Sequence, residues 1–266
     1  MNNTEVKIAG CRDYTPENVA AALSAVADFT QHVRPGMRVL IKPNLLSDHA
    51  PEDAVTTHPE VIRAVIRGVK AAGGIPSVGD SSASAVTLPQ VWKKTGAEQV
   101  CREEDVPLIS LEGEGARTVT RDGFTFTLSG ALSQCDGLIN VCKVKTHVLT
   151  TLTCGVKNLY GCIPGYQKAA LHKMIPTPRE FGRLIKAIAD EVRPILTIAD
   201  GIVAMEGDGP SSGTPMPLGI LAASADPFAL DMRLCDLLRI PRASVPYLRQ
   251  SSVVPRQSKI GEATDD

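Results

Sequence analysis

A long run of basic and imidazole side chains, with no acidic residue among them, is the part of this chain best suited to chemistry. Between Asp136 and Glu180 there is no aspartate or glutamate. In a chain whose formal net charge is -1, this local excess of positive charge predicts an anionic ligand. The basic and imidazole residues are Lys143, Lys145, His147, Lys157, Lys168, His172, Lys173 and Arg179, interleaved with Gly155, Gly161 and Gly165.

Three of these residues, Lys143, Lys145 and His147, alternate along a predicted strand and therefore share one face of it. Cations this close repel one another by ~1 kcal/mol per near pair in water, so a bound anion or a carboxylate such as Asp200 is expected to compensate. Neighbouring cations also lower the pKa of a lysine, which suits Lys143, Lys145 or Lys157 to proton transfer or imine formation. The residue types leave the choice among these lysines open.

Histidine is the second candidate for moving protons, because its ordinary pKa lies near neutrality. We predict that His147 or His172 transfers protons together with Asp200, which follows an apolar run. The segment from Glu206 to Gly213 is acidic and rich in glycine. It is either a lid over the substrate, with Glu206 in contact, or a surface turn.

Further polar residues follow apolar runs at the points where predicted strands end. In open α/β sheets, ligands bind beyond the carboxyl ends of the strands. The bland alternatives are that Lys42 only packs its stem while Asn44 forms a turn, and that Asp80 and Ser81 cap a helix. The predicted substrate contacts are Lys42, Asn44, Asp80, Ser81, Asn158, Tyr160 and Glu206.

Cofactor motifs are absent from the sequence. There is no GxGxxG after the first strand and no GxxxxGK[ST], so a nucleotide is not predicted. Seven cysteines without a CxxC pair indicate free thiols, and an iron–sulfur cluster held by this chain alone is not expected. Cys154 and Cys162 are interpreted as buried small residues. His147, His172, Asp200, Glu206 and Asp208 match no metal-binding spacing, so no metal site is predicted and the cofactor is left open.

The elements that position these residues alternate between strand and helix along most of the chain. This order predicts an α/β fold with a mostly parallel sheet covered by helices, and a β-hairpin around 113–128. We expect one domain over 1–245, either single or built of two intimate lobes, and a polar, loosely ordered tail over 246–266. The predicted strands are 6–10, 38–44, 75–80, 106–112, 136–145, 195–201 and 218–226, and the predicted helices are 17–33, 59–74, 88–96, 177–194 and 227–240.

Overall charge limits the classes of partner. The 28 basic and 29 acidic residues nearly balance, which argues against a nucleic-acid or membrane-surface binder. No apolar run approaches the roughly 18 residues that cross a bilayer, and the N-terminus lacks the pattern of a signal peptide. We therefore expect a cytoplasmic protein whose partner is a small anionic molecule. The oligomeric state is open, a homodimer included.

Several segments together resemble the domain of unknown function 362 family. They are IKPNLL (41–46), THPEVIRAVI (57–66), KVKTHVLTTLTCGVKNLYGCIPG (143–165), the pair His172-Lys173 and ADGIVAMEGDGPSSG (199–213). The resemblance covers most of residues 5–240. Many members of this family resemble iron–sulfur proteins because they carry an added ferredoxin-type cysteine cluster, which this chain lacks. The family implies no particular activity.

These observations favour a cytoplasmic enzyme that binds a small or medium-sized anionic organic substrate in a cleft rich in lysine and histidine. A lyase, isomerase or cyclase fits best, because acid–base chemistry of this kind needs no nucleotide. One alternative is an iron–sulfur or metal-linked redox accessory protein. The other is an anion-binding module without catalysis.

Overall fold

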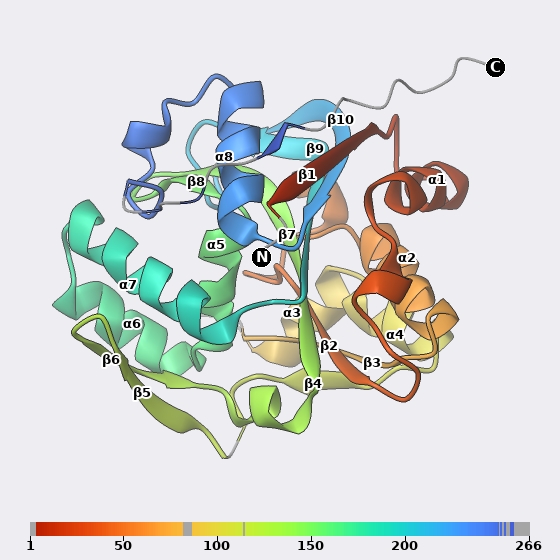
Figure 1. Ribbon diagram of the computed structural model, residues 1–266, viewed down its shortest axis with the longest axis horizontal. Helices are drawn as coiled ribbons and strands as arrows, with labels where there is room; N and C mark the ends of the chain where they lie inside the picture. Colours follow the sequence, from red (N-terminus) through yellow and green to blue (C-terminus); the bar gives the residue numbers. More distant parts are fainter. Residues whose placement is uncertain are drawn as a thin grey trace.

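Apolar, β-branched runs form the central strands of one large sheet, seen nearly edge-on in the computed structural model (Figure 1). The structure describes residues 4–81, 87–113, 115–249, 251, 253 and 256–257. Within these residues nine strands form the sheet, in the order β11-β1-β10-β9-β7-β2-β3-β4, with β8 paired to β7. The strands are β1 (Glu5–Gly10), β2 (Arg38–Pro43), β3 (Ile75–Asp80), β4 (Leu108–Ser110), β7 (Gly137–His147), β8 (Thr151–Thr153), β9 (Leu196–Glu206), β10 (Thr214–Ser224) and β11 (Arg256–Gln257).

The strands in the middle of the sheet are parallel to one another, whereas β10, towards one side, is antiparallel to its neighbours. Strands β4, β3, β2, β7 and β9 run in the same direction, whereas β10 is antiparallel to both β9 and β1. The carboxyl ends of β2, β3 and β7 therefore meet at one edge of the sheet, where loops and helix starts converge. The predicted α/β class with a mostly parallel sheet is confirmed.

Helices cover both faces of the sheet (Figure 1). One face packs against α1, α2 and α4, and the other against α5, α7 and α8. Neighbouring strand residues divide between the two layers of core, as Leu40 and Ile41 do. The helices are α1 (Pro16–Val26), α2 (Pro59–Ala71), α3 (Leu88–Lys94), α4 (Ala97–Glu103), α5 (Gly155–Asn158), α6 (Gly165–Met174), α7 (Pro178–Val192) and α8 (Pro227–Leu237).

Apolar spacing and capping explain the helices that the sequence predicted. In α7, Phe181, Leu184, Ile185 and Ile188 recur at helical spacing and are all buried. Thr177 starts this helix, because its hydroxyl oxygen accepts a hydrogen bond from the backbone N–H of Glu180. The predicted helix over 17–33 ends earlier than expected: α1 stops at Val26, and a short 3₁₀ turn (η1, Phe29–Gln31) follows.

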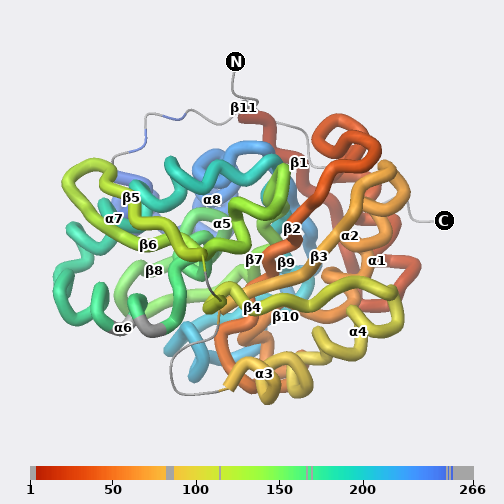
Figure 2. The backbone as a smooth tube through the Cα atoms, turned by 90° about the horizontal axis from the view of Figure 1, so that it is seen from below, coloured from red at the N-terminus to blue at the C-terminus, as the bar shows by residue number. Residues whose placement is uncertain are grey.

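The predicted hairpin is present as β5 (Arg117–Arg121) and β6 (Phe124–Leu128). Both views show it beside α7 (Figures 1 and 2), where Arg117 and Arg121 form ion pairs with Glu191 at 2.8 and 3.0 Å. The hairpin therefore closes the outer side of the layer that contains α5 and α7.

The start of the predicted tail packs against the core. Tyr247 and Leu248 are buried, and the hydroxyl of Tyr247 donates to the carbonyl of Leu152 at 3.1 Å. Strand β11 pairs with β1. Residues 250, 252, 254–255 and 258–266 lie outside the described residues, as does Ser82, so the loose order predicted for 246–266 stays a prediction.

Candidate functional site

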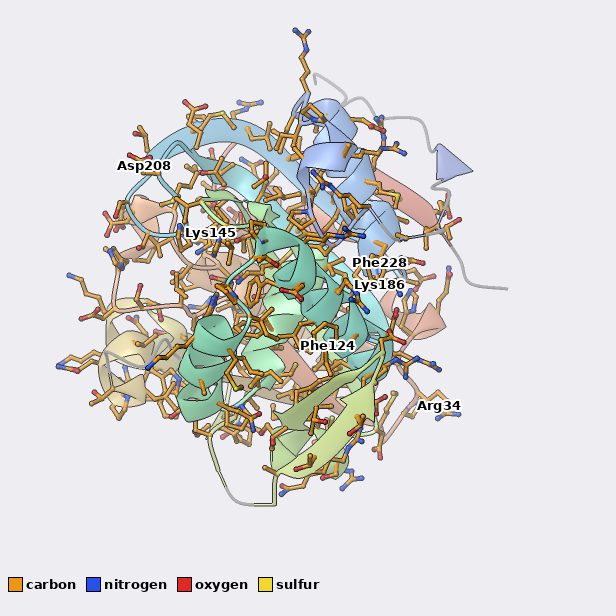
Figure 3. All side chains as sticks on the ribbon, turned by 90° about the vertical axis from the view of Figure 1, so that its left-hand side faces the viewer. Arg34, Phe124, Lys145, Lys186, Asp208 and Phe228 are labelled. Atoms are coloured by element: carbon orange, nitrogen blue, oxygen red, sulfur yellow. The ribbon has the colours of Figure 1, made fainter. Side chains whose placement is uncertain are left out.

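A cavity of about 240 Å³ lies at the carboxyl ends of β2, β3 and β7. Helices α5 and α6 and the 3₁₀ turn η4 (Leu159–Cys162) form its other walls, and Pro210 from the β9–β10 loop closes one side. Figure 3 shows Lys145 inside the molecule, near the β9–β10 loop whose outer edge carries Asp208. The cavity brings together ten of the predicted site residues: Lys42, Asn44, Asp80, Ser81, Lys145, His147, Lys157, Asn158, Tyr160 and His172.

An ion pair between Lys42 and Asp80 forms the floor between β2 and β3. The Lys42 ammonium lies 2.8 Å from the carboxylate, and both side chains are almost completely buried. The same carboxylate accepts from the backbone N–H groups of Leu45 and Ser81. Turn η4 crosses this pair closely, since a Cβ on Gly161 would stand 2.5 Å from Lys42 Nζ and 2.6 Å from the Asp80 carboxylate. Only glycine fits at this crossing.

Side-chain amides connect β2, β7 and α5 beside the ion pair. The amide nitrogen of Asn158 donates to Asn140, and its oxygen accepts from the amide of Asn44 at 2.9 Å. Two buried oxygens of the cavity wall, Asn44 Oδ1 and Thr153 Oγ1, have no hydrogen-bond partner among the described residues. Buried polar atoms are normally hydrogen-bonded, so these two oxygens are free to accept hydrogen bonds from a molecule in the cavity.

Lys157 reaches the cavity from the single turn of α5. Its ammonium lies over the rings of Tyr160 and Phe181, at 5.2 and 5.9 Å from their centroids. No side-chain or backbone oxygen in the described part of the chain accepts a hydrogen bond from it. Burial, followed by the charges of Lys168 and Lys42, lowers the pKa of Lys157 to about 7. At neutral pH the amine is therefore divided between its charged and neutral forms.

Lys145 lies near the end of β7, opposite Thr153 of β8. Its Nζ donates to the carbonyl of Val55 at 2.6 Å and to that of Pro210 at 3.0 Å. The side chain is 1% exposed. Burial lowers the pKa of Lys145 well below its ordinary value, and the positive charges of Lys157 and Lys143 add to the effect.

His147 lines the cavity as a fixed hydrogen-bond donor. Its Nδ1 accepts from the backbone N–H groups of Leu149 and Thr150 at 3.1 and 3.4 Å, so the hydrogen of the neutral ring is on Nε2. Burial, with Lys157 and Lys145 nearby, lowers the pKa of His147 to about 3. The geometry lets His147 donate to a ligand, whereas its Nε2 has no lone pair with which to accept a proton.

His172 and Tyr160 form an aromatic rim with Phe181. The His172 ring lies 4.3 Å from that of Phe181 and 5.5 Å from that of Tyr160. Burial against these rings, followed by the charges of Lys157 and Lys168, lowers the pKa of His172 to about 4. The Tyr160 hydroxyl donates to the carbonyl of Lys168 at 2.9 Å, which fixes the ring in the wall.

Ser81 and Lys168 link β3 to the opposite wall of the cavity. The Ser81 hydroxyl lies 2.7 Å from the carbonyl of Gly161 and 3.0 Å from that of Ile163, and the Lys168 ammonium donates to the carbonyl of Ser81. Burial lowers the pKa of Lys168 to about 8, while Asp80 opposes the shift. Lys168 was recognised in the acid-free stretch but was not predicted as a site residue.

The structure does not bring Lys143 and Asp200 to the cavity. Two residues deeper in β7 than Lys145, the Lys143 ammonium contacts the Asp200 carboxylate at 3.0 Å and the Tyr14 hydroxyl at 2.9 Å. Asp200 also accepts from Tyr14 and from the backbone N–H of His58, and the His58 ring stacks on Tyr14 at 3.6 Å. Burial lowers the pKa of Lys143, and Asp200 opposes that shift. This Lys143–Asp200 cluster is enclosed by its own partners.

The predicted acidic loop contributes its backbone to the site. Glu206 is exposed at the end of β9 and does not line the cavity. The loop instead packs on the end of β7, where Val148 N–H donates to the carbonyl of Gly209 and the Thr146 hydroxyl donates to that of Gly207. Its residue at the cavity is Pro210, whose carbonyl accepts from Lys145.

Comparison with known proteins identifies the family. The family model for the domain of unknown function DUF362 matches residues 39–236. The chain belongs to this family. A relative from Synechocystis sp., named as a thylakoid-associated protein, sll1697, is 40% identical over 228 residues, which are 85% of this chain and 70% of the relative. None of the helices in the described residues is long and apolar enough to cross a membrane.

A solved structure shares the fold of this DUF362 chain. The lactate racemase apoprotein from Thermoanaerobacterium thermosaccharolyticum superposes with a TM-score of 0.55 at 14% sequence identity. The match covers 88% of this chain and 57% of the racemase, so the chain spans little more than half of that protein's length.

A buried carboxylate that the sequence did not predict holds α5 in place. Asp231, at 0% exposure in α8, accepts from the backbone N–H groups of Gly155 and Val156 at 2.7 and 3.0 Å. Burial raises the pKa of Asp231 to about 7. A Cβ on Gly155 would stand 2.9 Å from this carboxylate, so glycine is needed for the close approach. Asp231 thus positions the turn that carries Lys157 and Asn158.

The seven cysteines are free thiols; Cys135 is half-buried and the other six are buried. Cys154 and Cys162 are completely buried, and burial raises the pKa of both. Within the residues that the structure describes, no group of three or more histidine, cysteine, aspartate or glutamate side chains is arranged to hold a metal ion.

Proposed function

We propose that this chain is an enzyme that binds a small organic anion in the cavity and performs acid–base chemistry on it, of the isomerase or lyase type. The observation that carries the proposal is Lys157, an amine with a pKa of about 7 that faces the cavity without a hydrogen-bond acceptor among the described residues. Perturbed lysines of this kind occur where a protein needs an amine that exchanges protons near neutral pH.

The balance of charge in the cavity supports an anionic ligand. Four lysines line it, and the carboxylate beside them, Asp80, is already paired with Lys42 and two backbone N–H groups. Lys157 and the Nε2–H of His147 remain available to a carboxylate or phosphate. Asn44 Oδ1 and Thr153 Oγ1 supply acceptors for a hydroxyl group on the same ligand.

The size of the cavity and the shared fold favour a small substrate. Pockets for drug-sized ligands begin at roughly 300 Å³, and this cavity, at about 240 Å³, lies below that size. Lactate, the substrate in the name of the racemase that shares the fold, is a small hydroxy acid. It carries both a carboxylate for the cations and a hydroxyl for the unpartnered oxygens. A 2-hydroxy acid is therefore the first class to test.

The test has a binding arm and a reaction arm. Calorimetry with D-lactate, L-lactate and inorganic phosphate is expected to show saturable binding. Lys157→Met should weaken it about tenfold to a hundredfold, since a charge-assisted hydrogen bond contributes about 1.5–3 kcal/mol. Lys157→Arg keeps the charge and is the matched control. Absence of binding for every anion contradicts the anion site.

The reaction arm uses solvent exchange, which reports proton abstraction whichever product forms. A panel of 2-hydroxy and 2-oxo acids is incubated with the protein in D₂O, and loss of the proton signal next to the carbonyl or carboxyl carbon is followed by NMR. Exchange with at least one acid is expected. Binding without any exchange across the panel supports a binding module and contradicts the enzyme.

A further inference from the structure

Two of the four lysines that line the cavity, Lys157 and Lys145, differ in the hydrogen bonds that they donate. Lys157 has no acceptor among the described residues, whereas Lys145 donates to the carbonyls of Val55 and Pro210 at 2.6 and 3.0 Å. An amine nitrogen has four tetrahedral positions, and in Lys145 the side chain and the two carbonyls occupy three. The fourth has no partner in the described part of the protein, and Lys145 lines the cavity.

The charges around Lys145 favour the amine over the ammonium. From β7 it faces Lys143 and His147, from α5 it faces Lys157, and the carboxylate that acts on it most, Asp80 of β3, is already paired with Lys42. Neither of its hydrogen-bond acceptors is charged. Desolvation penalises the charged form of a buried lysine, so these surroundings lower the pKa of Lys145 and favour its neutral amine.

We infer that Lys145 is the catalytic base of the cavity, a neutral amine whose two hydrogens are held by the Val55 and Pro210 carbonyls and whose lone pair faces the bound anion. This inference rests on the proposed function and assigns the base within it. His147 cannot take this role, because its Nδ1 accepts two backbone N–H groups and its Nε2 carries the hydrogen.

The step balances without a further reactant. The lone pair of Lys145 takes a proton from a C–H bond of the substrate, and the electron pair of that bond stays on the substrate, where the charge of Lys157 stabilises it. Lys145 becomes an ammonium that still donates to the two carbonyls. In an isomerase the proton returns to carbon. In a lyase the electron pair expels a leaving group.

The first test needs no substrate. In protein labelled with ¹⁵N-lysine, the Nζ signal of Lys145 is assigned by its disappearance in Lys145→Arg and followed from pH 6 to 8. We expect the chemical shift of a neutral amine throughout this range. The shift of an ammonium at pH 7 overturns the inference.

The second test asks whether the lone pair is accessible from the cavity. At pH 6 the protein is treated with formaldehyde or with glyoxylate, each with cyanoborohydride. The amine attacks the carbonyl carbon, water leaves, and hydride reduces the imine, so that a stable adduct marks the lysine in peptide mass spectrometry. Adducts are expected on Lys145 and absent on Lys143, a matched control two residues away that is enclosed by Asp200 and Tyr14.

The two aldehydes separate failure of the base from failure of the anion site. An adduct with neutral formaldehyde but none with anionic glyoxylate keeps the lone pair of Lys145 and contradicts the anion-binding part of the proposed function. No adduct on Lys145 with either aldehyde, or equal labelling of Lys143, overturns the inference.

The D₂O exchange assay then tests catalysis. Lys145→Met should lower the exchange rate by about 100-fold or more, as expected for loss of a positioned base, while the affinity for the anion changes by only a few-fold. Exchange within about threefold of wild type overturns the inference. No exchange by the wild-type protein is instead a failure of the proposed reaction, and the NMR and trapping results then decide the state of Lys145. Thermal unfolding of Lys145→Met confirms that the variant is folded.

Discussion

Lys143 and Lys145 lie two residues apart on β7, and both are almost completely buried, yet their surroundings differ in kind. Lys143 contacts a carboxylate and a phenol that have further partners of their own. Lys145 contacts two neutral carbonyls and faces a cavity with Lys157 across it. A buried cation paired with a carboxylate stabilises one arrangement of the chain, whereas buried amines without a counterion are what the proposed anion site requires.

Substitution of Asp200 should have the largest effect on the difference between the two lysines. Asp200→Asn keeps Oδ1, which accepts from Tyr14 and from the N–H of Ile202, but it turns an amide NH₂ towards Lys143 and the N–H of His58. Leaving one partner of a buried ion pair alone destabilises a protein by about 3–5 kcal/mol. We expect a loss of this size in urea unfolding.

The double variant tests whether the loss comes from the stranded cation. Lys143→Met combined with Asp200→Asn removes both charges and should be less destabilised than Asp200→Asn alone. Lys143→Met by itself should be milder still, since Asp200 retains three hydrogen-bond donors. If the double variant is no more stable than Asp200→Asn, the cluster is not held together as an ion pair.

Lys157 should show the opposite behaviour, with stability that improves when the charge is removed. Its pKa is about 7 in the folded protein against an ordinary value of 10.5. Between these values the unfolded chain binds more protons than the folded one, so the wild type gains stability as pH rises from about 7 towards 10.5. Below pH 7 Lys157 is charged in both states, and the full free-energy penalty of burying its charge lowers the stability of the wild type.

Lys157→Met removes this penalty, so the variant should be more stable than the wild type at pH 6. The difference between their free energies of unfolding should become smaller as pH rises to 10. Urea unfolding of both proteins at pH 6, 8 and 10 measures it, with Lys157→Arg as the control that retains the charge. A gap that stays constant with pH would mean that Lys157 titrates alike in the folded and unfolded chains.

The sequence predicted the layered fold and the edge of the sheet where the cavity lies, because apolar periodicity records both. Ten predicted residues do line the cavity. Short-range patterns could not show that Lys143 and Lys145, alternating on one face, have separate surroundings. That separation depends on two residues from distant loops: Tyr14 contacts Lys143, and His58 stacks on Tyr14 and donates to Asp200.

The contacts that hold the site in place could not be predicted from the sequence either, because they join residues that are far apart along the chain. Asp231 holds α5 from a helix 75 residues further along the chain. In PFALDMRLCDLL its one distinguishing feature is that it is a carboxylate among apolar residues. An acidic residue on the buried face of a predicted helix is the signal that could have found it, since such a group needs hydrogen-bond donors nearby. The glycine at 155 that receives it was visible only as part of a glycine-rich stretch.

Substitution of His147 should have the smallest effect on binding, because we expect His147 to donate a hydrogen bond to the ligand and Lys145 to act as the base. With a pKa of about 3 and two N–H groups donating to Nδ1, the ring should remain neutral, with its hydrogen on Nε2, throughout pH 5–8. Long-range ¹H–¹⁵N NMR distinguishes this tautomer from the imidazolium. His147→Gln, which retains a donor, should weaken lactate binding by only about threefold to tenfold, or ~1 kcal/mol. An imidazolium signal near pH 6 would return His147 to the list of groups able to exchange protons, and the assignment of the base to Lys145 would then have a competitor.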